Sequence, residues 1–292
     1  MIKTQVMSGL KSGGITMTLT PRKPTEKRLI VSEIFGPTFQ GEGRFLGQSA
    51  LFLRLGVCNL SCGFCDTKYS WDFANFNYRE TTKRLSINHV AGELLDKSGD
   101  YDSRFSDRED TIKRLVITGG EPMLQVEKLL RLLGCLPLDW TYEIETAGTI
   151  PFILNDWLDG ETGIGDSQHF RTPSVHFNIS PKLSNSGNDW FKAITYETLD
   201  SYLPLVLGKQ ESFSADFKFI VGHEDPIKDF SEISHLVQYL GIPNNKVFIS
   251  PMGTTPERIM KVTNRIADLV TYHRWNLTTR LHIIAWGDER GR

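Results

Sequence analysis

Residues 51–72 read LFLRLGVCNLSCGFCDTKYSWD, an apolar strand followed by a loop that carries three cysteines. Three residues separate Cys58 from Cys62, and two separate Cys62 from Cys65. Three clustered cysteines cannot all pair with one another, and a chain of 292 residues needs no disulfide to be stable. Thiolates bind iron well, so the loop predicts a metal or iron–sulfur site in a reducing compartment.

Two kinds of metal site are compatible with these cysteines. A [4Fe-4S] cluster with three protein ligands keeps one iron open, and that iron can hold S-adenosylmethionine through an amino nitrogen and a carboxylate oxygen. The alternative is a structural zinc ion bound by the three cysteines and a histidine. The chain has 7 histidines, but none lies at zinc-knuckle spacing, which favours the redox cluster. Cys135, flanked by leucines, is predicted to be a small buried residue.

The composition excludes several classes of protein. Hydrophobic residues make up 39% of the chain and charged residues 23%, with a net charge of −2, as in an ordinary globular protein. Near neutrality argues against a nucleic-acid partner. No apolar run is long enough to span a membrane, and the first residues lack the apolar core of a secretory signal. We therefore expect a cytoplasmic protein.

Short apolar strands alternate with helical segments after Ile30, which predicts an α/β fold with a parallel sheet and right-handed crossovers. About six parallel strands suit an incomplete (β/α) barrel or an open doubly wound sheet. In both, the site lies at the carboxyl ends of the strands. We expect strands at 50–55, 114–118, 141–145, 175–179, 216–221, 247–250 and 281–285, and helices at 86–97, 125–133, 196–205, 226–240 and 256–275.

The chain divides into an extension and one domain. Residues 1–27 are rich in Thr, Lys, Ser and Gly and are predicted to form a mobile N-terminal extension. Residues 28–292 are predicted to form a single domain. Within it, the polar stretches 72–84 and 155–174 look like inserted loops.

The cysteine spacing, with Phe64 just before the last cysteine, resembles the radical S-adenosylmethionine superfamily. Gly119-Gly120-Glu121-Pro122 agrees, because in that superfamily this segment follows a strand and receives the methionyl amino group. Further segments resemble the 7-carboxy-7-deazaguanine synthases, over about residues 30–292. These are EIFGPTFQGEG (33–43), CDTKYSW (65–71), ETAGT (145–149), SPK (180–182) and the ending LHIIAWGDERG (281–291).

The resemblance implies a reaction and its cofactors. A [4Fe-4S] cluster would reduce S-adenosylmethionine to a 5′-deoxyadenosyl radical, which would take a hydrogen from C6 of 6-carboxy-5,6,7,8-tetrahydropterin. Ring contraction and loss of ammonia would give 7-carboxy-7-deazaguanine. Mg²⁺, a homodimer and an electron donor such as flavodoxin are also implied. The alternatives are a glycyl-radical activating enzyme, although its additional ferredoxin-like cysteines are missing, and a non-catalytic zinc-binding α/β protein.

The resemblance also assigns residues to the substrate and to magnesium. Arg54 is expected to bind the substrate carboxylate, because an arginine inside an apolar strand needs an anionic partner. Thr67 matches the magnesium ligand, with a helix N-cap as the alternative. The pterin is expected to contact Phe39, Gln40, Gly41, Thr118 and, at the chain end, Arg292.

S-adenosylmethionine is assigned to the strand ends that surround the cysteine loop. Trp71 is expected to serve only packing, and Lys218 is left without a role. The residues expected to bind this cofactor are Phe64, Cys65, Asp66, Gly120, Glu121, Glu145, Thr146, Ala147, Ser180, Pro181 and Lys182.

Overall fold

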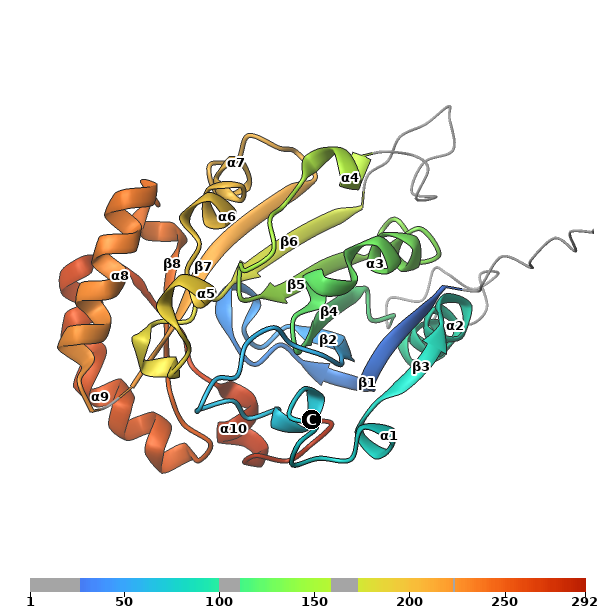
Figure 1. The fold of residues 1–292 in the computed structure, drawn as a ribbon, viewed down its shortest axis with the longest axis horizontal. Helices are drawn as coiled ribbons and strands as arrows, with labels where there is room; N and C mark the ends of the chain where they lie inside the picture. Colours follow the sequence, from blue (N-terminus) through green and yellow to red (C-terminus); the bar gives the residue numbers. More distant parts are fainter. Residues whose placement is uncertain (1–26, 100–110, 159–172, 223) are drawn as a thin grey trace, which may run out of the picture.

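A computed structural model of the chain describes residues 27–99, 111–158, 173–222 and 224–292. The predicted extension 1–27 lies outside these residues except for Lys27, and so does most of the predicted loop 155–174. The described residues form one sheet of nine strands in the order β3-β1-β2-β4-β5-β6-β7-β8-β9. Figure 1 shows this sheet curving, with the longer helices on its outer side.

The central part of the sheet is parallel and confirms the predicted incomplete barrel. Its order along the sheet follows the order along the chain, as expected for repeated strand–helix units. A short parallel strand, β9 (Asn276–Leu277), pairs with the last of the six longer parallel strands, β8. The six longer parallel strands are β2 (Ser49–Leu55), β4 (Arg114–Gly119), β5 (Thr141–Thr146), β6 (Ser174–Ile179), β7 (Phe213–Val221) and β8 (Val247–Pro251).

Two antiparallel strands at one edge were not predicted. β1 (Arg28–Phe39) pairs with β2, and β3 (Lys83–Ser86) pairs with β1. Few β1 side chains are buried and its register shifts twice, so it has no regular apolar alternation. The stretch 72–84 is also more ordered than a loop, because it contains α1 (Tyr78–Thr81) and the start of β3.

Four of the five predicted helices are present, with ends shifted by at most two residues. The fifth, at 196–205, is two short helices, because Pro204 has no backbone N–H to donate and lies in the first turn of the second one. The short helices at 154–158 and 190–193 were not predicted. The longer helices are α2 (Ile87–Ser98), α3 (Val126–Leu133), α8 (Pro226–Leu240) and α9 (Pro256–His273). The shorter ones are α4 (Leu154–Leu158), α5 (Trp190–Ala193), α6 (Tyr196–Asp200) and α7 (Leu203–Val206).

Two sequence predictions near chain turns are wrong. Residues 281–285, expected as a strand, belong to the helix α10 (Leu281–Trp286). Ile283 is its one buried residue. A short apolar segment is compatible with a strand or a helix, so the apolar residues of 281–285 could not distinguish the two. Cys135 is exposed rather than buried, because the chain turns after α3 and only the neighbouring leucines point inward.

Alternation along the parallel strands separates two environments. On β7, Phe217 and Phe219 are fully buried in the apolar core beneath the helices. Asp216 and Lys218 alternate with these phenylalanines along β7. Their side chains point to the inside of the barrel, where they make ion pairs. The inside of the barrel is therefore polar and can hold a site.

The amino ends of the parallel strands are filled by the 3-10 helix η1 (Gly43–Phe45), which follows β1. The Arg44 guanidinium pairs with the Asp216 carboxylate. The ring of Phe45 packs edge-on against His176, with ring centroids 5.0 Å apart. The guanidinium carbon of Arg114 lies 3.9 Å from the Phe45 ring centroid. This end of the barrel is therefore occupied by side chains.

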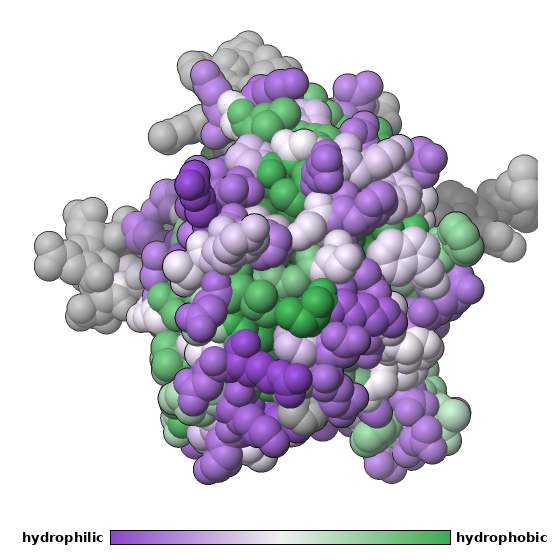
Figure 2. Space-filling view, turned by 90° about the vertical axis from the view of Figure 1, so that its left-hand side faces the viewer, coloured by the Kyte–Doolittle hydropathy of each residue, from purple (hydrophilic) through white to green (hydrophobic). Residues whose placement is uncertain are grey.

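The face formed by α8 and α9 carries hydrophobic residues among hydrophilic ones (Figure 2). Ile227 and Tyr239 on α8, and Met260 and Tyr272 on α9, are exposed. Within the part of the chain that the structure describes, no helix is both long and apolar enough to cross a bilayer.

Candidate active site

A pocket inside the barrel, towards the carboxyl ends of the strands, brings most of the predicted site residues together. Glu121 and Pro181 are exceptions, because both are buried without lining it. The predicted residues that line it are Phe39, Gln40, Gly41, Arg54, Cys58, Cys62, Phe64, Cys65, Asp66, Thr67, Thr118, Gly120, Glu145, Thr146, Ala147, Ser180, Lys182 and Arg292.

The cysteine loop leaves β2 through a strained turn. Val57, just before Cys58, has a φ of 77°, which a β-branched residue rarely adopts. Hydrogen bonds on both sides hold it: Val57 N donates to Ser70 O over 2.8 Å, and Glu121 N donates to Val57 O over 2.9 Å. Such strain is commonly found at functional sites. Here it turns Cys58 into the pocket.

Gly120 and Glu121 join this turn to the neighbouring strands. A Cβ atom at Gly120 would lie 1.9 Å from the carbonyl oxygen of Val57, so only glycine fits. The Glu121 carboxylate accepts hydrogen bonds from Thr146 Oγ1 (2.7 Å) and Ala147 N (2.8 Å). Burial raises its pKa. Glu121 therefore holds the ends of β4 and β5 in position.

The three cysteines of the loop lie where they can hold a [4Fe-4S] cluster. All three line the pocket, and three protein thiolates hold such a cluster while leaving one iron open. Burial raises the pKa of Cys58 to about 11 and also raises that of Cys62, so metal binding must displace protons.

Thr67 lies beside the cysteines at the N-cap position of the 3-10 helix η2 (Lys68–Ser70). Its side chain makes no capping hydrogen bond. Its Oγ1 lies 3.6 Å from Cys65 Sγ and lines the pocket, so the hydroxyl is placed where it can reach a bound ligand.

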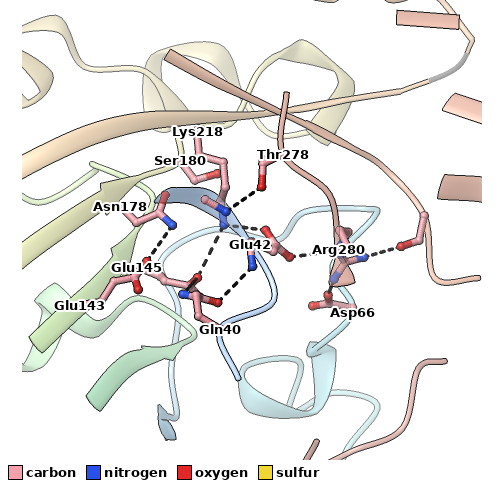
Figure 3. Close-up of polar contacts among 12 residues, drawn as sticks. Gln40, Glu42, Asp66, Glu143, Glu145, Asn178, Ser180, Lys218, Thr278 and Arg280 are labelled. Atoms are coloured by element: carbon pink, nitrogen blue, oxygen red, sulfur yellow. Dashed lines mark hydrogen bonds and ion pairs between the residues drawn. The ribbon is translucent and has the colours of Figure 1, made fainter. Parts of the chain in front are cut away.

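The floor of the pocket is a network of buried charges (Figure 3). Lys218 Nζ donates to Glu42 Oε2 over 2.6 Å and lies 3.7 Å from Glu145 Oε1. Arg280 Nε donates to the other Glu42 oxygen over 3.0 Å, and its terminal nitrogen pairs with Asp66. Burial alone would raise the pKa of Glu42, but the charges of Lys218 and Arg280 outweigh it and hold that pKa well below its usual range. The floor thus presents an ionised Glu42.

Gln40 connects this floor to a second pair of carboxylates on β5. Its Nε2 donates to Glu145 Oε1 over 3.3 Å, and its Oε1 accepts from Glu42 N over 3.2 Å. Two residues earlier on β5, Glu143 accepts a hydrogen bond at Oε1 from Asn178 Nδ2 over 3.1 Å. Burial and the charge of Glu145 raise the pKa of Glu143 to about 7. Glu143 therefore holds a proton more readily than an exposed carboxyl does.

Glu143 predicts a pH-dependent stability. The pKa of Glu143 is about 7 in the folded protein and 4.5 in the unfolded chain. Between pH 4.5 and pH 7 the folded state therefore binds more protons than the unfolded state. This contribution to the free energy of unfolding is fully present below pH 4.5 and falls by about 3 kcal/mol as pH rises through 7. Glu143→Gln removes the titration and can still accept from Asn178. Urea denaturation at several pH values measures the free energy of unfolding. Between pH 5 and pH 8 we expect this free energy to rise for the variant relative to the native protein.

The matched control is Glu127→Gln, because Glu127 is exposed on α3. It should leave the pH profile unchanged. Parallel stability profiles for the native protein and Glu143→Gln would place the proton elsewhere.

Arg54 has an anionic partner within the protein. Its Nε donates to Glu33 Oε2 over 2.9 Å, and the Tyr69 hydroxyl donates to the same oxygen over 2.9 Å. Glu33 also pairs with Arg290, whose guanidinium carbon lies 4.0 Å from the Tyr69 ring centroid. This group attaches the C-terminal tail to the segment that follows the cysteine loop. Figure 1 shows the end of the chain beside that segment, and Arg292 lines the pocket.

Several pocket residues were not predicted as site residues. Glu42 lies within the FQGEG segment, which is a usable signal, whereas the sequence gives Lys218 no role and indicates packing for Trp71. Arg280 and His282 flank Leu281, the first residue of α10, where the apolar run predicts a strand. His282 explains Gly41, because a Cβ atom there would lie 2.0 Å from His282 Nδ1.

A partial parallel barrel whose first parallel strand leads into three pocket-lining cysteines defines a radical S-adenosylmethionine enzyme. No model of a known protein family matches the chain. A 7-carboxy-7-deazaguanine synthase from Pyrobaculum aerophilum is 31% identical over 282 residues, covering 94% of this chain and 100% of that protein. The one from Bacillus subtilis is 27% identical over 91% of this chain and 99% of its own length. The chain belongs to the 7-carboxy-7-deazaguanine synthase family.

A solved structure supports the fold. QueE from Escherichia coli matches with a TM-score of 0.55 and 21% identity, over 87% of this chain and 95% of that one. The likeness extends over almost the whole described barrel and shows a shared architecture.

Proposed function

We propose that this protein is a carbon–nitrogen lyase that converts 6-carboxy-5,6,7,8-tetrahydropterin to 7-carboxy-7-deazaguanine with loss of ammonia. One observation carries the proposal: the FQGEG segment, the cysteine loop and the end of the chain, which are far apart in sequence, line the same pocket. Family membership over the length of the chain agrees with it.

The floor suits the pterin ring. A pterin has N–H donors along its edge, and the ionised Glu42 and the Gln40 amide offer acceptors next to one another. Phe39 stacks on Trp286, with ring centroids 4.5 Å apart, and its ring lines the pocket beside Gln40 and Gly41. Arg54, Thr118 and Arg292 would bind the substrate carboxylate and the ring edge. Arg54 can take that carboxylate while its Nε stays on Glu33.

The wall that carries the cysteines suits the cofactors, together with Asp66 and Glu145 of the floor. When bound, the [4Fe-4S] cluster and S-adenosylmethionine supply the electron and the hydrogen-abstracting group. Cys58, Cys62 and Cys65 would hold the cluster, and Thr67 with water and substrate oxygens would hold Mg²⁺. Lys182 Nζ donates to Ser180 O over 2.7 Å, which fixes the loop after β6. The remaining residues that would hold S-adenosylmethionine are Phe64, Asp66, Gly120, Glu145, Thr146, Ala147 and Ser180, with Glu121 and Pro181 supporting them from behind.

Product analysis tests the function directly. The protein is reconstituted anaerobically with iron and sulfide and supplied with S-adenosylmethionine, Mg²⁺, a reductant and 6-carboxytetrahydropterin. We expect 7-carboxy-7-deazaguanine and an equal amount of ammonia, with S-adenosylmethionine regenerated at each turnover. Cleavage of S-adenosylmethionine with the pterin left unchanged would assign a different substrate.

Thr67→Ala should weaken the dependence of the rate on Mg²⁺. Its hydroxyl is the only side-chain oxygen at this position, and the variant keeps the three cysteines. We expect about tenfold more Mg²⁺ to be needed for half-maximal rate, as for loss of one metal-site partner, while slow cleavage of S-adenosylmethionine continues. An unchanged magnesium titration would remove Thr67 from the site.

Removal of residues 288–292 should raise the KM for the pterin and leave the cluster in place. The truncation deletes Arg290, which pairs with Glu33, and Arg292, which lines the pocket, but none of the cysteines. Iron content and steady-state kinetics measure the two effects. Unchanged kinetics would show that the tail does not reach the substrate.

The assembly and its surroundings are also proposals. We expect a cytoplasmic homodimer that receives electrons from a carrier such as flavodoxin. The two sheet edges, β3 and β9, and the exposed apolar residues on α8 and α9 support an interface between two copies. Light scattering that gives only a monomer at micromolar concentration would count against the dimer.

A further inference from the structure

We propose that Trp71 and Asn188 are positioning residues that raise the reduction potential of the cluster by donating N–H groups to its cysteine ligands. The inference rests on the proposed function, since it concerns the same cysteines. It assigns a role in the reaction to two side chains that neither bind iron nor belong to the predicted ligand set.

Trp71 is held with its indole N–H on a cysteine sulfur. Its Nε1 lies 3.2 Å from Cys65 Sγ, and its backbone N donates to Lys68 O over 3.0 Å at the end of η2. The indole nitrogen can only donate, and a partly buried one needs an acceptor. The sulfur is that acceptor, so the ring does more than fill space beside the pocket.

Asn188 reaches a second cysteine from the loop after β6. Its Nδ2 lies 3.1 Å from Cys62 Sγ, and its Oδ1 accepts from Ser61 N over 2.9 Å. Because the oxygen is used by a backbone N–H, the amide nitrogen must face the sulfur. The same loop is fixed to the cysteine segment by Gly63 N, which donates to Ser186 O over 2.9 Å.

The third cysteine completes the pattern. Leu60 N donates to Cys58 Sγ over 3.4 Å, so each of the three sulfurs accepts one N–H group. Two of these donors are side chains and can be changed without altering the backbone of the loop.

The expected direction follows from charge. Reduction adds one electron to the cluster, and part of the additional negative charge lies on the cysteine sulfurs. Hydrogen bonds to a more negative acceptor are stronger, so N–H donors stabilise the reduced cluster more than the oxidised one. Hydrogen bonding to metal ligands is a general way in which proteins tune metal sites.

The test is a redox titration of the reconstituted enzyme followed by electron paramagnetic resonance, without the pterin. For Trp71→Phe we expect the ratio of reduced to oxidised cluster at a fixed potential to fall about tenfold, a shift of about 59 mV for one electron. Incorporation of 3-benzothienylalanine at position 71, which replaces N–H by sulfur at nearly the same size, should give the same shift. Asn188→Leu should shift the potential in the same direction.

Trp140→Phe is the matched control. Trp140 is fully buried, and its Nε1 has no hydrogen-bond partner among the described residues, so the potential should stay at the native value. A native potential in the benzothienylalanine protein would overturn the role of Trp71, whether or not Trp71→Phe retains its iron. A native potential in Asn188→Leu would overturn that of Asn188. Lower potentials in an enzyme that leaves the pterin unchanged would instead remove the proposed function and keep this inference.

Discussion

Cys62→Ala is expected to abolish turnover and to lower the iron content of the reconstituted protein to background. Cys62 is one of three cysteines that line the pocket, and loss of one leaves the cluster with two protein ligands. Cys58→Ala and Cys65→Ala should behave alike. Iron and sulfide analysis, the absorption near 400 nm and product formation measure the effect, and the variants should remain folded by circular dichroism.

Cys135→Ala is the control for this experiment. Cys135 is exposed beyond the end of α3 and is absent from the pocket lining. Its removal should leave iron content and rate at their native values. If the Cys135 variant lost the cluster while Cys62→Ala kept it, the ligand assignment would be wrong.

Lys218→Met should lower the free energy of unfolding by about 3–5 kcal/mol, because it leaves Glu42 and Glu145 without the cation between them. Burial would lower the pKa of Lys218, but the charges of Glu42 and Glu145 raise it above its usual value, so the lysine is charged. Urea denaturation of the apoprotein measures the loss. Adding Glu42→Gln should restore part of it, since one uncompensated carboxylate is then removed.

Lys113→Met is the matched control, because Lys113 also lies 2.6 Å from a carboxylate, that of Asp139, but on the surface. A pair this exposed stabilises by at most about 1 kcal/mol. Equal losses for the two lysine variants would mean that the pocket floor is hydrated and its charges are screened.

The sequence predicts those structural elements that are determined by residues close together in the chain. Apolar runs located all six longer parallel strands, and the spacing within eight residues located the cysteine loop. The antiparallel β1 was missed because its side chains are mostly half-buried and its register is interrupted. A short apolar run such as 281–285 fits a strand or a helix equally well, and only its tertiary packing, which buries Ile283 alone, distinguishes the two.

The charged floor could not be found in this way. Lys218 and Glu42 are 176 residues apart, and Arg280 and Glu42 are 238 apart, so no local pattern joins them. Each taken alone resembles a surface charge. They become a site only because the barrel brings β7, the segment after β1 and the start of α10 to one interior.

The filling of the amino ends of the strands by Arg44 and Phe45 has a consequence for the order of events in catalysis. Because side chains occupy that end, we expect both organic ligands to enter at the carboxyl ends of the strands, where the pocket lies. We then expect the molecule that sits deeper to arrive first and depart last, so that binding is ordered. Inhibition by product should accordingly be competitive towards one ligand and not towards the other.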